Sequence, residues 1–246
     1  MTGFRTAISA EWMKFRNALL PRMATIGLVA VPSLVSPMST SSRGGQSALA
    51  AADWAAYFDM SAGTVATGGL FGFGLVIVWL FGREFVDGTI AGLFGLPVRL
   101  GQIALAKIVL FTLWACAVTA MLSLALLCVG AAIGLGAFDG AALAALARFG
   151  TVSVLTASLT VPFALVATLS RDYLAPIGVI LGVVILTSVL AQAGLGGWLP
   201  YAAPGMWAGA GGAGDPIVIA IQLANVVILA ALFAGLVVRR WKRLEI

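Results

Sequence analysis

Charged residues and histidine are scarce in this chain of 246 residues. Only 9% of the residues are Asp, Glu, Lys or Arg, and none is His, whereas a typical soluble domain is about 25% charged. The lack of histidine excludes a histidine-based proton relay or metal site. With 61% hydrophobic residues and a mean hydropathy of +1.09, the composition predicts a protein that lies in a membrane.

Cysteines and nucleotide-binding motifs are also sparse. Cys116 and Cys128 share one apolar run, so we expect two buried small side chains and no disulfide between them. The sequence has no G-x-x-x-x-G-K-[ST] phosphate loop and no catalytic or metal-ligating constellation. We therefore expect a chain that is not an enzyme, binds no cofactor and has no energy source of its own.

Apolar runs of about 20 residues recur along the chain, and this length crosses a bilayer as a helix. The alternating polarity that is typical of membrane β-strands does not occur. The sequence therefore predicts an all-α polytopic membrane protein, organised as one domain over residues 1–246. Its six spans are expected at about 19–38, 62–81, 108–133, 148–169, 174–195 and 216–238.

The positive charges indicate the orientation of these spans. Six spans place both termini on one side, and all Lys and Arg residues except Arg43 and Arg148 then fall on that side. Because cytoplasmic loops carry the excess of Lys and Arg, we expect both termini in the cytoplasm and residues 40–61 and 196–215 outside. The net charge of +5 is explained by these span ends, and no nucleic-acid partner is expected.

The first 18 residues have apolar side chains at helical spacing. The spacings are 4, 4 and 3, which place on one face Phe4, Ile8, Trp12 and Phe15. This pattern predicts an amphipathic helix in the cytoplasmic interface, with Arg5 and Arg16 in water. A plain basic flank of the first span is the alternative.

Two further segments are predicted to lie at the outer surface. Asp53–Phe58 contains three aromatic residues and resembles an interfacial aromatic anchor. Gly196–Asp215 lacks Lys and Arg, and is too interrupted by Gly and Pro to span the membrane. A re-entrant or interfacial segment before the sixth span fits it best. Within the second span, Gly68 and Gly72 form a G-x-x-x-G pair that permits close helix packing.

The segment between the second and third spans contains helix punctuation. Asp87-Gly88 is typical of a turn, Thr89 can cap a helix, and Pro97 can end one. These signals predict a short cytoplasmic helix over Ile90–Leu96. Leu93 and Phe94 give this helix an apolar surface, which in the cytoplasm usually marks a partner site. Packing of the same residues under the bundle is the alternative.

The predicted spans contain few polar residues. None has an Asp, Glu, Lys or Arg near its centre, which argues against ion coupling through carboxylates. Gln192, Gln222 and Asn225 remain. For Asn225 a helix–helix hydrogen bond inside the bundle is the main interpretation. A substrate path lined by these three residues is the second interpretation.

Three stretches resemble one known family, the membrane subunits of type-2 ABC exporters. The first is Arg83-Glu84-Phe85-Val86-Asp87-Gly88-Thr89, followed by Leu93, Leu96-Pro97-Val98 and Lys107. It is similar to the family pattern Glu-Phe, Gly-Thr, Pro-Val and Lys between the second and third spans. The second is Ala10-Glu11-Trp12 with Lys14 and Arg16, which resembles the family's N-terminal helix. The third is Leu199-Pro200 with Ala203-Pro204, which resembles its loop before the last span. The family usually has Ser or Thr and then Arg after Pro-Val, whereas here Arg99 follows directly.

The resemblance implies a permease subunit that couples ATP hydrolysis to export. Its partners would be an ATP-binding subunit, which holds ATP and Mg²⁺, and a second permease copy or paralogue in the plasma membrane. The nearest style is that of bacitracin- and lantibiotic-type exporters, with a peptide, drug or lipid as substrate. The residues implied for coupling are Glu84, Phe85, Asp87, Gly88, Thr89, Ile90, Leu93, Phe94, Leu96, Pro97 and Arg99.

Two alternatives from other classes stay open at this point. A membrane sensor or assembly protein would need neither a pore nor an ATPase partner. An ion-coupled secondary transporter would need charged groups within its spans, and the predicted spans have none near their centres. An ATP-binding subunit encoded beside this chain would distinguish the exporter from both.

Overall fold

The structure is a computed structural model that describes residues 2–42, 53–95, 98–193, 196, 199–209, 211 and 214–244. All regular elements among these residues are helices, and six helical stretches are long and apolar enough to cross a membrane. The predicted all-α fold with six spans is therefore confirmed. Leu96, Pro97 and Arg43 lie outside the described residues.

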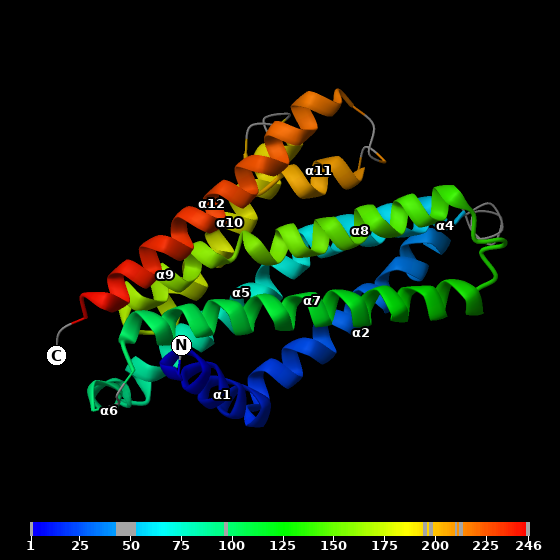
Figure 1. The fold of residues 1–246 in the computed structure, drawn as a ribbon. Coiled ribbons are helices and arrows are strands. Elements are labelled where there is room, and N and C mark those ends of the chain that lie inside the picture. The colour runs from blue at the N-terminus through cyan, green and yellow to red at the C-terminus, as the bar shows by residue number, and fades with distance from the viewer. Residues whose placement is uncertain are drawn as a thin grey trace.

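The helices form a bundle with both chain ends at the same end (Figure 1). α1 (Thr2–Asn17) precedes the first span, α2 (Leu19–Ser42). The second span joins α4 (Trp54–Thr64), the π-helix η1 (Val65–Gly69) and α5 (Leu70–Val86). α6 (Ile90–Phe94) leads to the third span, α7 (Leu100–Ala132).

The fourth span consists of α8 (Gly140–Ser158) and α9 (Val161–Ser170). It breaks at Leu159 and Thr160, two residues before Pro162. Proline has no N–H group and its ring clashes with the carbonyl four residues earlier, so the helix cannot continue through it. The fifth and sixth spans are α10 (Leu174–Gln192) and α12 (Pro216–Lys242), with α11 (Ala203–Gly209) between them.

The aromatic residues after Asp53 belong to the core, so the predicted surface anchor is wrong. Asp53 accepts a hydrogen bond from the backbone N–H of Ala56 at 2.7 Å and starts α4 there, well before the predicted span. The side chains that follow are buried: Trp54, Tyr57 and Phe58. They pack against α8, because α4 and α8 lie side by side over their length.

The two cysteines are exposed, which corrects the prediction that they are buried. Both lie on α7, and their side chains are accessible in the described chain. α10 and α12 are more exposed still, because only 11% and 6% of their most apolar stretches are buried. Exposed apolar side chains along a span are expected where lipid or another membrane helix is the neighbour.

One glycine of the G-x-x-x-G pair lies at a helix contact. A Cβ atom on Gly72 would lie 2.6 Å from Leu28 Cδ2 of α2, so the absent side chain lets α5 and α2 approach closely. Gly68 faces open space. In the segment before the sixth span, α11 buries Ala203, Pro204 and Ala208 against α4 and α8.

Candidate functional site at the basic end of the bundle

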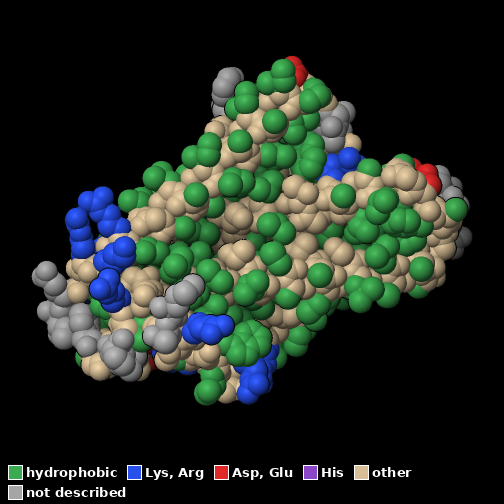
Figure 2. All heavy atoms as spheres, in the orientation of Figure 1, with side chains coloured by type: hydrophobic (Ala, Val, Ile, Leu, Met, Phe, Trp, Pro, Cys, Tyr) green, Lys and Arg blue, Asp and Glu red, His purple; other side chains and the backbone are tan. Residues whose placement is uncertain are grey.

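Basic side chains gather at the end of the bundle that holds α1, α6 and the C-terminal end of α12 (Figure 2). We call this the basic end. Its exposed cations include Arg5, Arg16, Arg99, Arg239, Arg240, Lys242 and Arg243. Beneath them, the structure encloses a second set of charges that the surface view does not show.

The buried face of α1 is shifted by about one position in the sequence from the predicted apolar face. Ala7, Glu11 and Phe15 are buried, with Glu11 only 2% exposed, whereas Trp12 is 52% exposed. These residues recur every four positions, as one side of a helix must. Of the face predicted to contact protein or lipid, Phe15 is buried, Phe4 and Ile8 pack against the core, and Trp12 is exposed. Apolar periodicity could not show that a carboxylate points into the bundle.

Glu11 is drawn inward by two cations from other helices. Its Oε2 atom accepts hydrogen bonds from Arg83 Nη2 of α5 at 3.0 Å and from Lys107 Nζ of α7 at 2.8 Å. Lys107 Nζ also donates to Glu84 Oε1 at 3.1 Å and to the Leu80 carbonyl at 3.0 Å. One ammonium group thus joins α1, α5 and α7.

Lys14 completes the set at its solvent-facing rim. Its Nζ atom lies 3.2 Å from Glu84 Oε1 and 3.6 Å from Glu11 Oε1, and its side chain is 43% exposed. We call Glu11, Lys14, Arg83, Glu84 and Lys107 the charge cluster. It holds three cations and two carboxylates, and all members except Lys14 are nearly inaccessible to water. Buried charges persist only when they are paired and hydrogen-bonded, as these are.

The charge cluster is bonded directly to the N-terminus of α6. The Thr89 hydroxyl donates to Glu84 Oε2 at 2.6 Å. Thr89 occupies the N-cap position of α6, but its side chain makes no capping hydrogen bond, because the hydroxyl is turned to Glu84 instead. The predicted capping role of Thr89 is therefore wrong. Its hydroxyl links α6 to the charges that join α1, α5 and α7.

The indole of Trp241 connects α12 to the same place. Its ring lies 5.9 Å from Lys107 Nζ and packs edge-on against Phe81 and Phe85 of α5. Its Nε1 atom donates to Thr168 Oγ1 of α9 at 3.1 Å. Trp241 is fully buried. Through it, α9 and α12 rest on the charge cluster as well.

The other residues implied for coupling surround this link. Asp87, Gly88 and Thr89 are exposed in the turn before α6, where Gly88 has a φ of +67° that favours glycine. Phe85 and Ile90 are half-buried, and Arg99 is exposed at the start of α7. Phe94 lies in α6.

Leu93 is 6% exposed and packs into the main core of this chain, so its side chain is not open to a partner. This corrects its predicted role on the partner-facing surface of the short helix. Among the residues of α6 and its C-cap whose burial the structure describes, the exposed ones are Ala91, Gly92 and Gly95.

The three polar residues suggested for a substrate path do not form one group. Gln192 is exposed at the end of α10 and donates to the Ser188 carbonyl of its own helix at 3.2 Å. Gln222 and Asn225 lie on α12, and Asn225 is exposed. The interpretation that Asn225 bonds another helix inside the bundle is therefore wrong.

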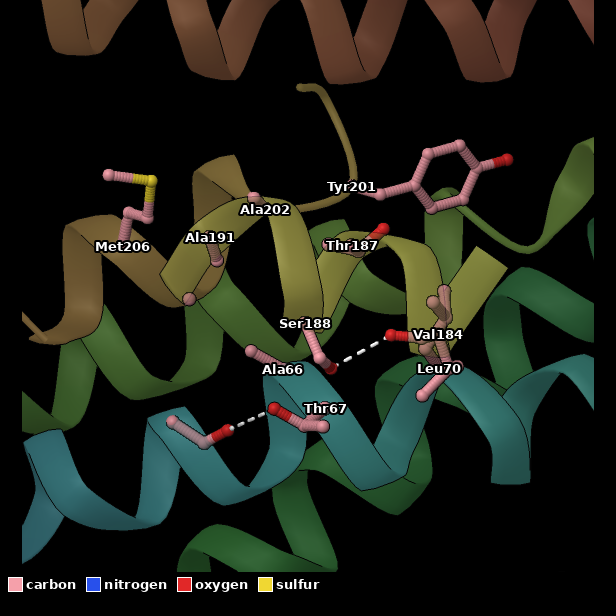
Figure 3. Close-up of a pocket in the computed structure, with 12 residues that line it drawn as sticks. Ala66, Thr67, Leu70, Val184, Thr187, Ser188, Ala191, Tyr201, Ala202 and Met206 are labelled. Carbon is pink, nitrogen blue, oxygen red and sulfur yellow. Dashed lines mark hydrogen bonds between the residues drawn. The ribbon is translucent and has the colours of Figure 1, made fainter. Parts of the chain in front are cut away.

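A pocket of about 270 Å³ lies at the π-helix instead (Figure 3). Thr67 and Ser188 border it from η1 and α10, and both hydroxyls are bonded to carbonyls of their own helices, at 3.2 and 2.8 Å. Tyr201 lies at its edge, and burial raises the pKa of Tyr201 to about 12, so this hydroxyl stays protonated at neutral pH. Thr187 also lines the pocket, and the remaining lining residues are apolar or glycine, which suits an apolar or amphipathic ligand.

The described spans contain charges near their ends, although none lies at a centre. At the end opposite the charge cluster, Arg148 of α8 and Asp59 of α4 form a two-pronged ion pair, with N–O distances of 2.7 and 2.9 Å. Both side chains are largely shielded from water. Charges therefore fasten helices at both ends of the bundle, and apolar packing fills the length between them.

A family model for ABC-2 family transporter proteins matches residues 7–188. The chain belongs to the ABC-2 transporter family. The match covers most of α1, the charge cluster, α6 and most of α10. In ABC-2 transporters this domain is the membrane-spanning component and not the ATPase, so an ATP-binding partner is implied in general. The comparison with curated proteins returned no match.

Membership of the ABC-2 family confirms the resemblance to type-2 ABC permeases that the sequence suggested. Four members of the charge cluster were not among the predicted site residues: Glu11, Lys14, Arg83 and Lys107. A signal existed for Lys107, because apolar residues flank it on both sides in the sequence and a buried ammonium group needs carboxylate partners.

Proposed function

We propose that this chain is the permease subunit of an ATP-driven exporter, and that its ATP-binding partner docks on α6 at the basic end. The observation that carries the proposal is the bond from Thr89 to Glu84, because it joins α6 to a charge cluster that spans three helices. A push on α6 would reach α1, α5 and α7 together. In this proposal the chain is one permease domain, and ATP and Mg²⁺ are bound by the partner.

The exposed part of α6 is the proposed contact surface. Ala91, Gly92 and Gly95 offer a small, smooth surface, with Asp87 and Arg99 exposed on either side of it. Leu93 plays the opposite role and anchors α6 to the bundle through the core. The short helix is thus held on one face and free on the other, which suits an element that passes on a movement.

The complete exporter, in this proposal, holds two permease chains and two ATP-binding subunits. The basic end faces the cytoplasm, where the partner binds ATP, and the chain lies in the plasma membrane. Closure of the ATP-binding subunits would shift α6 and reorient the spans. The apolar pocket beside η1 and the resemblance to bacitracin- and lantibiotic-type permeases support an apolar or amphipathic substrate.

The contact can be tested with one substitution on each face of α6. Ala91→Asp adds a charge to the exposed face, so we expect the chain to fold normally but to lose co-purification with its ATP-binding subunit and transport-coupled ATP hydrolysis. Leu93→Asp places an unpaired charge in the core and should instead reduce the amount of folded chain, at a cost of several kcal/mol. Normal partner retention and hydrolysis in Ala91→Asp would refute docking on α6.

A further inference from the structure

A second hollow, of about 230 Å³, lies between the third, fourth and sixth spans. We call it the α7–α12 groove. One wall is α7 and the other is α12, and its floor is the break between α8 and α9, where Ala157, Ser158 and Val161 lie. The wall residues include Ile108, Thr112, Cys116, Val227, Ala231 and Ala234.

The groove exists because small side chains meet a helix break. Ala231 and Ala234 of α12 and Ala157 of α8 leave space that leucine would fill. The helix of the fourth span is interrupted at Leu159 and Thr160, because Pro162 prevents a continuous helix. The hollow is therefore built into the packing of α7, α8, α9 and α12.

The chemistry of the groove fits a hydrocarbon chain. Its hydroxyl groups are already bonded within their own helices: Thr112 donates to the Ile108 carbonyl at 3.0 Å and Ser158 to the Val154 carbonyl at 2.9 Å. The remaining lining side chains are apolar apart from the exposed thiol of Cys116. A polar occupant would find no free hydroxyl donor among them, whereas an acyl chain needs no hydrogen bond.

The two helices that form the walls of the groove, α7 and α12, meet at Lys242 at the basic end. Gly101 lies two turns before Ile108 on the same face of α7, and Lys242 lies eight residues after Ala234 on α12, about 12 Å along the helix axis. The two meet, because a Cβ atom on Gly101 would be only 2.6 Å from Lys242 Cγ. Lys242 therefore stands where the groove ends.

The ammonium group of Lys242 has no carboxylate partner among the described residues, and its side chain is exposed. Arg239, three residues earlier on α12, is likewise exposed and unpaired in the described part of the chain. Lysine and arginine at the end of a membrane helix lie at the level of the lipid headgroups and attract anionic ones.

We propose that the α7–α12 groove is a binding site for an anionic phospholipid. One acyl chain lies in the groove, and the phosphate-bearing headgroup is held by Lys242 and Arg239. The unpaired cations Arg239 and Lys242 lie about 7.5 and about 12 Å beyond Ala234 along the α12 axis, so the hollow and the cations match the order of acyl chain and headgroup in a phospholipid. The site lies apart from the charge cluster, and it does not depend on the proposed docking of an ATPase.

The test is native mass spectrometry of the detergent-purified chain, titrated with phosphatidylglycerol or with zwitterionic phosphatidylcholine. We expect phosphatidylglycerol to bind more tightly. Each basic side chain beside an anionic headgroup contributes about fivefold in affinity, so Lys242→Gln with Arg239→Gln should weaken phosphatidylglycerol binding by about 25-fold. Binding of phosphatidylcholine should change little, because its headgroup has no net charge.

Groove occupancy is tested by a matched pair on α12. Ala231→Leu fills the groove and should weaken binding of both lipids, whereas Ala224→Leu adds the same volume to an exposed position outside the groove lining and should not. For the headgroup, Arg5→Gln on α1 combined with Arg22→Gln on α2 is the control with equal charge change. Excess inorganic phosphate should leave the bound lipid in place, since the acyl chain contributes to binding.

Three outcomes would overturn the proposal. The first is equal affinity for the two lipids in the unchanged chain. The second is loss of the lipid to inorganic phosphate, which would indicate a site for free phosphate. The third is an efficient Cys116–Cys116 crosslink between two copies in membranes, which would show that a second copy covers the groove.

Discussion

Replacing Lys107 by methionine should destabilise the chain more than the same change at Lys14. The two lysines belong to one charge cluster and contact the same carboxylates, but the Lys107 side chain is fully buried and that of Lys14 is 43% exposed. Lys107 also donates to the Leu80 carbonyl. The pair therefore separates the effect of burial from the effect of charge.

The expected magnitudes follow from what each change leaves behind. Removing one partner of a buried ion pair costs about 3–5 kcal/mol, whereas an exposed pair contributes about 0–1 kcal/mol. Without Lys107, Arg83 and Lys14 still balance Glu11 and Glu84, so we expect about 3 kcal/mol for Lys107→Met. Glu11→Gln leaves three cations with one carboxylate and should cost more, about 5 kcal/mol.

The assay is thermal unfolding of the purified chain in detergent, with the double variant included. A loss of about 3 kcal/mol corresponds to a fall in Tm of about 6–12 °C for a chain of this size. Glu11→Gln with Lys107→Met should cost less than the sum of the single changes, by about 0.5–3 kcal/mol. Equal effects of Lys107→Met and Lys14→Met, or strict additivity in the double variant, would refute the coupled cluster.

Two further changes test the link to α6 and the packing of α4. Thr89→Val removes the hydrogen bond to Glu84, so we expect the free energy of unfolding to fall by at most about 1.5–3 kcal/mol. We also expect a clear fall in partner-stimulated ATP hydrolysis. Unchanged hydrolysis would contradict the link between α6 and the charge cluster. Gly130→Ala puts a methyl group into the Trp54 ring and should lower stability by about 1–3 kcal/mol. Gly150→Ala, where a methyl group meets open space, should be neutral or stabilising, as the same unfolding assay would show.

Composition and run length were sufficient to predict the fold class. Six apolar stretches must be helices because lipid offers no partners to backbone N–H and C=O groups, and the described chain has six such stretches. The punctuation after Asp87 also placed a short helix correctly at its start, since α6 begins at Ile90. These are local or one-dimensional properties, and no contact between distant residues is needed to infer them.

The limits of the spans and the burial of individual residues were decided by tertiary contacts. The aromatic side chains of Trp54, Tyr57 and Phe58 are as typical of a membrane interface as of a core. They belong to the core because α8 lies beside α4. Apolar periodicity placed Trp12 on the apolar face and gave no position for Glu11, whereas in the structure Glu11 is buried and Trp12 is exposed. Periodicity within one helix carries no information about cations on other helices, so it cannot predict that a carboxylate is buried.

The charge cluster is the clearest case of what sequence alone leaves undetermined. Glu11, Glu84 and Lys107 are separated by 73 and 23 positions in the chain, and each by itself would be expected in water. Folding brings Lys107 Nζ within 2.8 Å of Glu11 and 3.1 Å of Glu84. A charge can be buried only when its partners are already in place, so the structure that supplies the partners decides where it lies.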